Sequence, residues 1–230
     1  MPEENNAFHI GIPIYNGVDL MDVAAPYEIF NWMGYYWNQD PVAPRTVKVE
    51  LIAATCDTVK TRDGMILTPD TTFDAVEQYL DAVKQYLDLL WVPGGDPDAL
   101  TAQMHNPIYL GFLQRQADGA GYVTSVCEGA LLLASAGLLD GYEATTHWAF
   151  IPCLKSFCEI KVADGYPRFV VDRNRVTGGG ISSGIDEALE LVARVSSYAI
   201  AKQVQLVTQY FPRPPFTGDI PGSDTCPINL

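Results

Sequence analysis

Segments rich in apolar and β-branched residues alternate with amphipathic helical segments along most of this chain. The strands are expected at residues 8–15, 46–55, 88–93 and 122–127. The first of them, FHIGIPIY, has no polar alternation, which is typical of a strand buried on both faces. Such an order predicts an α/β fold: a single-domain, doubly wound, mainly parallel sheet with helices on both faces, as in flavodoxin-like proteins. One domain is expected over residues 1–230, ending in an irregular proline-rich tail, 212–230.

Several local features are predicted in more detail. Pro26 fits the first turn of a helix at residues 23–34, and Asp63-Gly64 fits the turn of a hairpin within 59–73. A helix after Gly129 is expected to continue to Gly141. Two or three strands should follow within 159–180, and then one long or two joined helices within 183–211. Ligands of such sheets bind beyond the carboxyl ends of the strands.

The charge balance restricts the partners. The chain has 14 Lys and Arg against 28 Asp and Glu, a net charge of −14. Nucleic acid and anionic membrane surfaces would be repelled, whereas a small uncharged organic molecule would not. The first residues, MPEENNAFHI, lack the basic and apolar regions of a signal peptide, and the apolar run GALLLASAGLL is too short to span a membrane. We expect a cytoplasmic protein.

The cysteines and histidines are scattered. The five cysteines form no C-x-x-C pair and the three histidines lie far apart, so no metal site is expected: Cys56, Cys127, Cys153, Cys158, Cys226, His9, His105 and His147. Disulfides are rare in the cytosol. Four of the cysteines are therefore expected to be ordinary thiols.

Cys127 differs from the other cysteines because it lies where a strand meets a helix. A helix N-terminus offers unpaired N–H groups and a partial positive charge, both of which favour a thiolate. The small residues Gly129 and Ala130 behind it permit the tight turn of a nucleophile elbow. The alternative is a free cysteine that serves as a small hydrophobic side chain. The position favours a reactive thiol.

Four stretches resemble a known superfamily. They are DLMDVAAPYEIF, WVPGGDPDAL, VTSVCEGALLLASAGLLDGYEATTHW and VTGGGISSGIDEALELV, within residues 8–211. They resemble the ThiJ/PfpI superfamily, which has a class I glutamine-amidotransferase-like fold, and within it the isonitrile hydratases. The resemblance implies a homodimeric enzyme without metal or organic cofactor, a hydro-lyase that converts an isonitrile and water to an N-substituted formamide.

The resemblance also assigns residues. The nucleophile falls on Cys127, and its acidic partner, four residues before Pro26, falls on Asp22. Asp19 and Glu28 are the competing carboxylates. In the hydratases a threonine that contributes to catalysis follows the cysteine, and here that position is Glu128. We expect Glu128 to point toward the thiol; the alternative is that it turns outward and caps the helix.

Other candidates each have a structural alternative. His147 is either a catalytic partner of the thiol or a support for a turn or a dimer contact. Gly94 and Gly95 either form an oxyanion hole or a plain turn, and Gly180 either lines the pocket or belongs to a helix start capped by serine. Two other functions stay open: a ligand or redox sensor that does not bind DNA, and a thiol enzyme of glyoxalase-like or amidase-like activity.

Overall fold

The computed structural model describes residues 7–83 and 86–230. Residues 1–6, which make up most of the segment that was expected not to be a signal peptide, lie outside the described residues. The same holds for residues 84–85, where a helix was expected to give way to the strand at 88–93.

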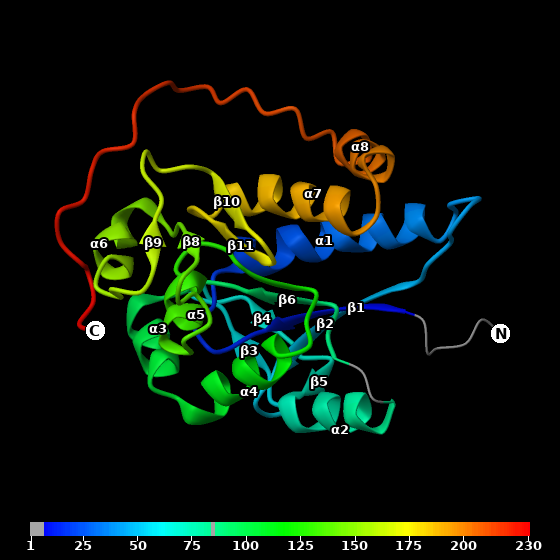
Figure 1. The fold of residues 1–230 in the computed structure, drawn as a ribbon, viewed down its shortest axis with the longest axis horizontal. Helices are drawn as coiled ribbons and strands as arrows, with labels where there is room; N and C mark the ends of the chain where they lie inside the picture. Colours follow the sequence, from blue (N-terminus) through cyan, green and yellow to red (C-terminus); the bar gives the residue numbers. More distant parts are fainter. Residues whose placement is uncertain (1–6, 84–85) are drawn as a thin grey trace.

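A seven-stranded sheet forms the centre of the molecule, in the order β10-β11-β7-β6-β1-β2-β5 (Figure 1). All neighbouring strands run parallel except β10 and β11. The strands are β1 (Phe8–Pro13), β2 (Val47–Ala53), β5 (Thr71–Thr72), β6 (Leu89–Val92), β7 (Tyr122–Ser125), β10 (Phe169–Asp172) and β11 (Arg175–Gly178). Every residue of β1 and β6 is buried, because helices cover both faces of these strands.

The helices form two layers, one on each face of the sheet. One layer packs α1 (Leu20–Trp37) against α7 (Ser183–Val195) and α8 (Tyr198–Val207). The other contains α2 (Phe73–Val83), α3 (Pro97–Met104), α4 (Pro107–Ala117) and α5 (Gly129–Ser135), and Figure 1 shows it on the opposite side of the strands. The predicted fold class, a mainly parallel α/β sheet covered on both faces, is confirmed.

Shorter elements surround this core. The hairpin β3 (Val59–Lys60) and β4 (Ile66–Leu67) turns at Gly64, which has a φ of +94°. On the other side lie β8 (Glu143–Ala144), β9 (Lys161–Val162), a 3₁₀ turn (Trp148–Phe150) and α6 (Ile151–Leu154). The expected turn at Asp63-Gly64 is therefore present.

Two predicted boundaries were wrong, and one helix was missed. Helix α1 begins at Leu20, so Pro26 lies inside it rather than in its first turn. Helix α5 ends at Ser135, well before Gly141, because Gly137 adopts a φ of +71° that a helix cannot continue. Helix α3 was not expected, although Asp96 and Pro97 form an N-cap and first position typical of a helix start.

The C-terminal tail contains no helix or strand, as expected. The prediction that Cys153 and Cys226 are ordinary thiols was wrong: they form a disulfide that links α6 to the tail across 73 residues. Figure 1 shows the tail returning from α8 to end beside α6. Sequence spacing could not show this pairing, because it depends on the path of a segment without periodic structure. Cys56, Cys127 and Cys158 are free.

Among the described residues no helix is both long enough and apolar enough to cross a lipid bilayer.

The disulfide makes a testable prediction. Protein unfolded without reductant should present three titratable thiols, and five after reduction, because only Cys153 and Cys226 are paired. Cys226→Ser should lower the free energy of unfolding by roughly 2–4 kcal/mol, the usual contribution of a cross-link over a long loop. Cys158→Ser, which removes an exposed free thiol, is the matched control. Five thiols before reduction would contradict the pairing.

Candidate active site

Cys127 occupies a strained turn between β7 and α5. Its φ is +56°, a left-handed conformation that residues other than glycine adopt infrequently. Its N–H donates to the Gly179 carbonyl over 2.9 Å, and its own carbonyl accepts from the Thr146 hydroxyl over 2.8 Å. The two bonds hold the strained backbone in place. This is the geometry of a nucleophile elbow, with the side chain presented at the carboxyl ends of the strands.

Gly94, which follows β6, allows the neighbouring turn to approach. A Cβ at this position would lie 2.5 Å from Oε2 of Glu128 and 3.0 Å from Cβ of Cys127, so only glycine fits without a shift. The Gly94 N–H donates to Oδ2 of Asp22 over 3.0 Å. Gly94 was one of the candidates for an oxyanion hole. In the structure its N–H donates to Asp22 and thereby orients the candidate acid.

Asp22 lies in the first turn of α1, and a proline four residues later changes the hydrogen bonding of its carbonyl. Pro26 has no N–H, so the carbonyl of Asp22, four residues earlier, loses its helical donor. The indole N–H of Trp91, on β6, donates to that carbonyl over 2.9 Å instead. The helix and the sheet are thus joined at the residue whose carboxyl faces the thiol.

The structure brings Asp22, Cys127 and Glu128 together. One oxygen of each carboxyl and the sulfur all lie within 4.8 Å of one another, and all three residues are buried. Glu128 points inward, as expected, and makes no side-chain capping bond to α5. By spacing alone the trio suits a metal ion such as Zn²⁺. Metal ligands must be deprotonated, so binding of a cation here would release the protons that burial favours on Asp22 and Cys127.

Burial keeps protons on this centre. It raises the pKa of the Asp22 carboxyl well above its usual range, and the charges of Asp19 and Glu128 raise it further. Burial likewise raises the pKa of the Cys127 thiol, reinforced by Asp22 and by a hydrogen bond to Glu128. The expectation that the helix start favours a thiolate is therefore contradicted in direction, because desolvation and two neighbouring acids raise the pKa of the thiol and favour its protonated form.

The competing carboxylates have other partners. Asp19 caps α1 by accepting the Met21 N–H over 3.3 Å, and its second oxygen lies 3.0 Å from the guanidinium of Arg62. Glu28 lies on the exposed side of α1 and accepts the indole N–H of Trp32. Of the three acids, only Asp22 reaches the sulfur.

His147 lies at the edge of the trio. Its Nδ1 accepts the Ala149 N–H over 3.3 Å and is 3.9 Å from Oε1 of Glu128. Because Nδ1 acts as an acceptor, the proton of the neutral ring is on Nε2. A Cβ on Gly180 would overlap the ring, so that glycine makes room for the histidine. Gly95 packs in the same way against the Tyr15 hydroxyl and the Gly17 carbonyl.

Sequence reasoning missed two residues of this site. The Ile181 N–H forms a hydrogen bond to the Cys127 sulfur that lowers the thiol pKa, and Ile181 has a positive φ of +24°. Glu187, on α7, is fully buried, and neither carboxyl oxygen has a partner among the described residues. Burial raises the Glu187 pKa well above its usual range, as does the charge of Asp22. Serine capping, the alternative given for Gly180, is not seen at Ser182, whose side chain makes no capping bond. Ile181 left no sequence signal, and Glu187 was not distinguished from the other acidic residues near the start of α7.

The comparison with known protein families decides the classification. The model of the DJ-1/PfpI family matches residues 9–194.

The chain belongs to the DJ-1/PfpI family.

Individual DJ-1/PfpI relatives support this assignment. The isonitrile hydratase of Pseudomonas putida is 37% identical over 221 residues, which cover 96% of this chain and 86% of the relative. A crystal structure of a ThiJ/PfpI family protein from Pseudomonas syringae has a TM-score of 0.77 and 32% identity, over 91% of this chain and 78% of that one. DJ-1β of Drosophila melanogaster shares the fold at a TM-score of 0.72 and 18% identity, over 88% of this chain and 98% of that one.

The buried acid on α7 leads to a prediction about stability. In the folded protein Glu187 keeps its proton above the roughly 4.3 at which it ionises when unfolded, so the free energy of unfolding falls as pH rises through that window. Glu187→Gln should weaken this pH dependence, and Glu187→Met should raise the free energy of unfolding at pH 8 by roughly 1–3 kcal/mol. Denaturant melts at pH 5 and pH 8 measure both.

The matched control is Glu190→Gln on the same helix, where the carboxyl is partly exposed and pairs with Arg194. It should leave the pH dependence unchanged. A Glu187→Met protein less stable than the parent at pH 8 would show that the buried carboxyl is stabilising.

Proposed function

We propose that this protein hydrates an isonitrile to an N-substituted formamide, with Cys127 as nucleophile and Asp22 as acid and base. The observation that carries the proposal is the buried pair formed by the Cys127 thiol and an Asp22 carboxyl oriented by the Gly94 N–H. The 37% identity to an isonitrile hydratase across nearly the whole chain supports the same reaction. The left-handed turn at Cys127 accompanies the placement of its sulfur within 4.8 Å of carboxyl oxygens of Asp22 and Glu128.

The first step joins the thiol to the terminal carbon of the isonitrile. The sulfur attacks that carbon as its proton passes to the Glu128 carboxylate, to which the thiol is hydrogen-bonded. Asp22, which holds a proton because it is buried, protonates the same carbon. The carbon gains one sulfur and one hydrogen, and the product is a thioimidate bound to Cys127.

The second step releases the formamide. Asp22 is now ionised and takes a proton from a water molecule as the water oxygen attacks the thioimidate carbon. Glu128 gives its proton to the nitrogen and takes up the proton of the new hydroxyl as the carbon–sulfur bond breaks and the carbonyl of the formamide forms. The thiolate recovers its proton from Glu128. One isonitrile and one water are consumed, and both carboxyls return to their starting states.

The electrostatics suit an uncharged substrate. An isonitrile adds no net charge when it enters the buried centre, so the protonated thiol and acid need not ionise to admit it. A free thiolate at the base of the pocket would instead be destabilised by Asp22 and Glu128. Because the thiol proton passes to Glu128 while Asp22 protonates the substrate carbon, no free thiolate forms during the attack.

Turnover of cyclohexyl isocyanide tests the proposal directly. Purified protein should form N-cyclohexylformamide, and Cys127→Ala should abolish the reaction. Asp22→Asn should reduce kcat/KM by at least about 10²-fold, the usual loss when a general acid is removed. Asp19→Asn is the matched control and should retain most activity, because Asp19 caps α1 instead of contacting the sulfur.

Absence of turnover by the folded parent protein would refute the proposed reaction. Equal losses for Asp19→Asn and Asp22→Asn would refute the assignment of the acid while leaving the reaction in place.

Glu128 should set the pH dependence of the reaction. Its negative charge raises the pKa of both Asp22 and the Cys127 thiol, so Glu128→Thr should lower both pKa values. The pH optimum for isonitrile turnover should therefore move downward, with activity lowered but not abolished, because threonine cannot take up the thiol proton that Glu128 accepts. Glu143→Thr, at an exposed position on β8, is the control. Superimposable pH–rate profiles of parent and Glu128→Thr would contradict this role.

A further inference from the structure

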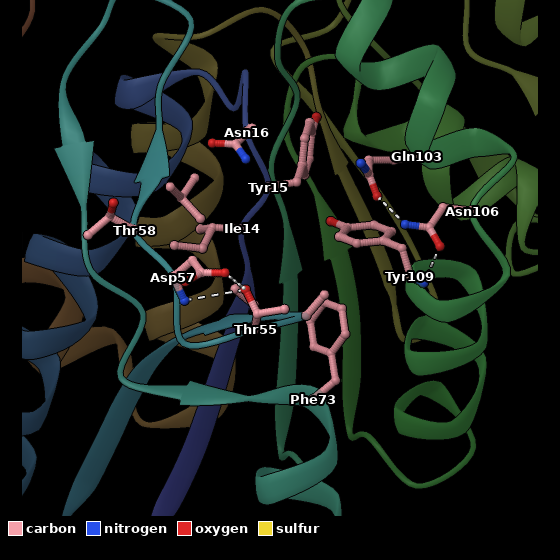
Figure 2. A pocket seen from close by; sticks show the side chains of 13 residues that line it. Ile14, Tyr15, Asn16, Thr55, Asp57, Thr58, Phe73, Gln103, Asn106 and Tyr109 are labelled. Atoms are coloured by element: carbon pink, nitrogen blue, oxygen red, sulfur yellow. Dashed lines mark hydrogen bonds between the residues drawn. The ribbon is translucent and has the colours of Figure 1, made fainter.

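A cavity lies at the carboxyl ends of β1 and β2, beside the proposed active site (Figure 2). Its volume is about 210 Å³, and none of Cys127, Asp22 and Glu128 lines it. The sheet extends from β1 toward β2 on one side and from β6 toward β7 on the other, so the cavity lies next to the point where the strand order reverses. Crevices at that point of a doubly wound sheet commonly bind ligands.

Aromatic side chains form the floor of this cavity. Tyr15, Phe73 and Tyr109 are all buried. The ring of Tyr109 meets Tyr15 edge-on at 5.5 Å and Phe73 at 5.8 Å between centroids, and its hydroxyl donates to the Pro13 carbonyl. With this hydroxyl already bonded inward, the floor offers ring faces and edges. Such a surface favours an apolar ring or alkyl group.

The neighbouring helix fixes the amide groups at the rim. Asn106 caps α4 by accepting the Ile108 N–H over 3.0 Å, so its nitrogen must face the other way. That nitrogen donates to Oε1 of Gln103 over 2.9 Å. The Gln103 nitrogen is then left without an acceptor among the described residues. Helix capping thus determines which end of Gln103 faces the cavity.

The opposite rim shows the same pattern. Oδ1 of Asn16 accepts the Lys60 N–H over 2.9 Å, which leaves the Asn16 nitrogen without an acceptor among the described residues. Figure 2 shows the amide nitrogens of Asn16 and Gln103 on either side of Tyr15, each directed toward it. The rim therefore presents two amide N–H donor groups, one on each side of the Tyr15 ring.

The charges at the rim restrict the ligand further. The cavity is lined by one carboxylate, Asp57, which accepts from the Thr55 hydroxyl over 3.0 Å, and by no Lys or Arg. An anion would meet Asp57 with no cation to offset it. A neutral carbonyl oxygen suits the two amide donors, and an N–H of the same ligand suits Asp57.

We propose that this cavity binds a small neutral amide, whose carbonyl oxygen accepts from the Gln103 nitrogen beside the Tyr15 ring and whose apolar substituent packs on Tyr15, Phe73 and Tyr109. The site does not depend on the proposed reaction. Tyr15 is also the wall shared with the active site, because its hydroxyl packs against Gly95 and lies 3.5 Å from the Pro93 carbonyl. An amide bound here would therefore touch the residue that separates the two sites.

Titration of the full-length ¹⁵N-labelled protein with three cyclohexyl compounds tests the site. N-Cyclohexylformamide is neutral, cyclohexanecarboxylate is anionic and cyclohexylammonium is cationic, while the ring is constant. The neutral amide should shift the side-chain NH₂ signals of Asn16 and Gln103 saturably, and the carboxylate should not. Gln103→Glu exchanges a donor for an acceptor and should weaken binding of the formamide about tenfold.

Gln39→Glu is the matched control, because it adds the same charge at an exposed position after α1 and should leave binding unchanged. If Gln103→Glu fails to fold, Gln103→Met should give the same weakening. The proposal would be overturned by shifts confined to residues around Cys127, by equally tight binding of the carboxylate, or by the absence of saturable shifts. Because no step of this test involves turnover, its outcome is independent of the isonitrile assay.

Discussion

The approach of the Gly94 backbone to the Cys127–Glu128 turn is the constraint on which the active centre depends. These two turns follow adjacent parallel strands, β6 and β7, whose spacing of about 4.8 Å leaves little room between them. At Gly94 the missing side chain admits Glu128, and the buried N–H orients Asp22. One residue without a Cβ therefore sets the position of both acids relative to the sulfur.

Three ionisable groups are buried around this contact, and their proximity has an energetic consequence. Asp22, Cys127 and Glu187 each favour the protonated form, because burial disfavours charge and each acid opposes ionisation of its neighbours. Arg62 offsets part of this from the hairpin, mainly through Asp19. A fold selected for stability alone would place apolar side chains at such positions. Retention of acids there is typical of a chemical site, where local rules are broken for function.

Sequence reasoning reached the fold and the centre of the site by two routes. The strands of the sheet followed from runs of apolar and β-branched residues, and Cys127 followed from its place between a strand and a helix. Asp22 came from resemblance, since its loop position was misjudged: the helix starts at Leu20 and tolerates Pro26 inside it because Trp91 supplies the missing donor. Compensation of that kind involves residues 69 apart in sequence and leaves no local pattern.

The sequence could not predict the raised pKa of the Cys127 thiol either, because it too depends on residues far apart in the sequence. A helix start favours a thiolate, but the opposing effects of burial, Asp22 and Glu128 depend on tertiary packing. Likewise, the acidic side chain of Glu187 looked like an ordinary helix residue until α7 was seen to bury it against β11. Local periodicity specifies which residues face inward on average, and it does not specify the partners they find there.

The disulfide between Cys153 and Cys226 closes a covalent ring that contains β9, β10, β11, α7 and α8. Ile181 and Glu187, the two site residues that sequence reasoning missed, both belong to this ring, whereas Asp22, Cys127 and Glu128 lie outside it. In the oxidised chain a single backbone cut anywhere within the ring leaves one connected molecule. Ile181, whose N–H contacts the sulfur, and the buried Glu187 thus stay attached to the segment that carries Cys127, even when the polypeptide between them is broken.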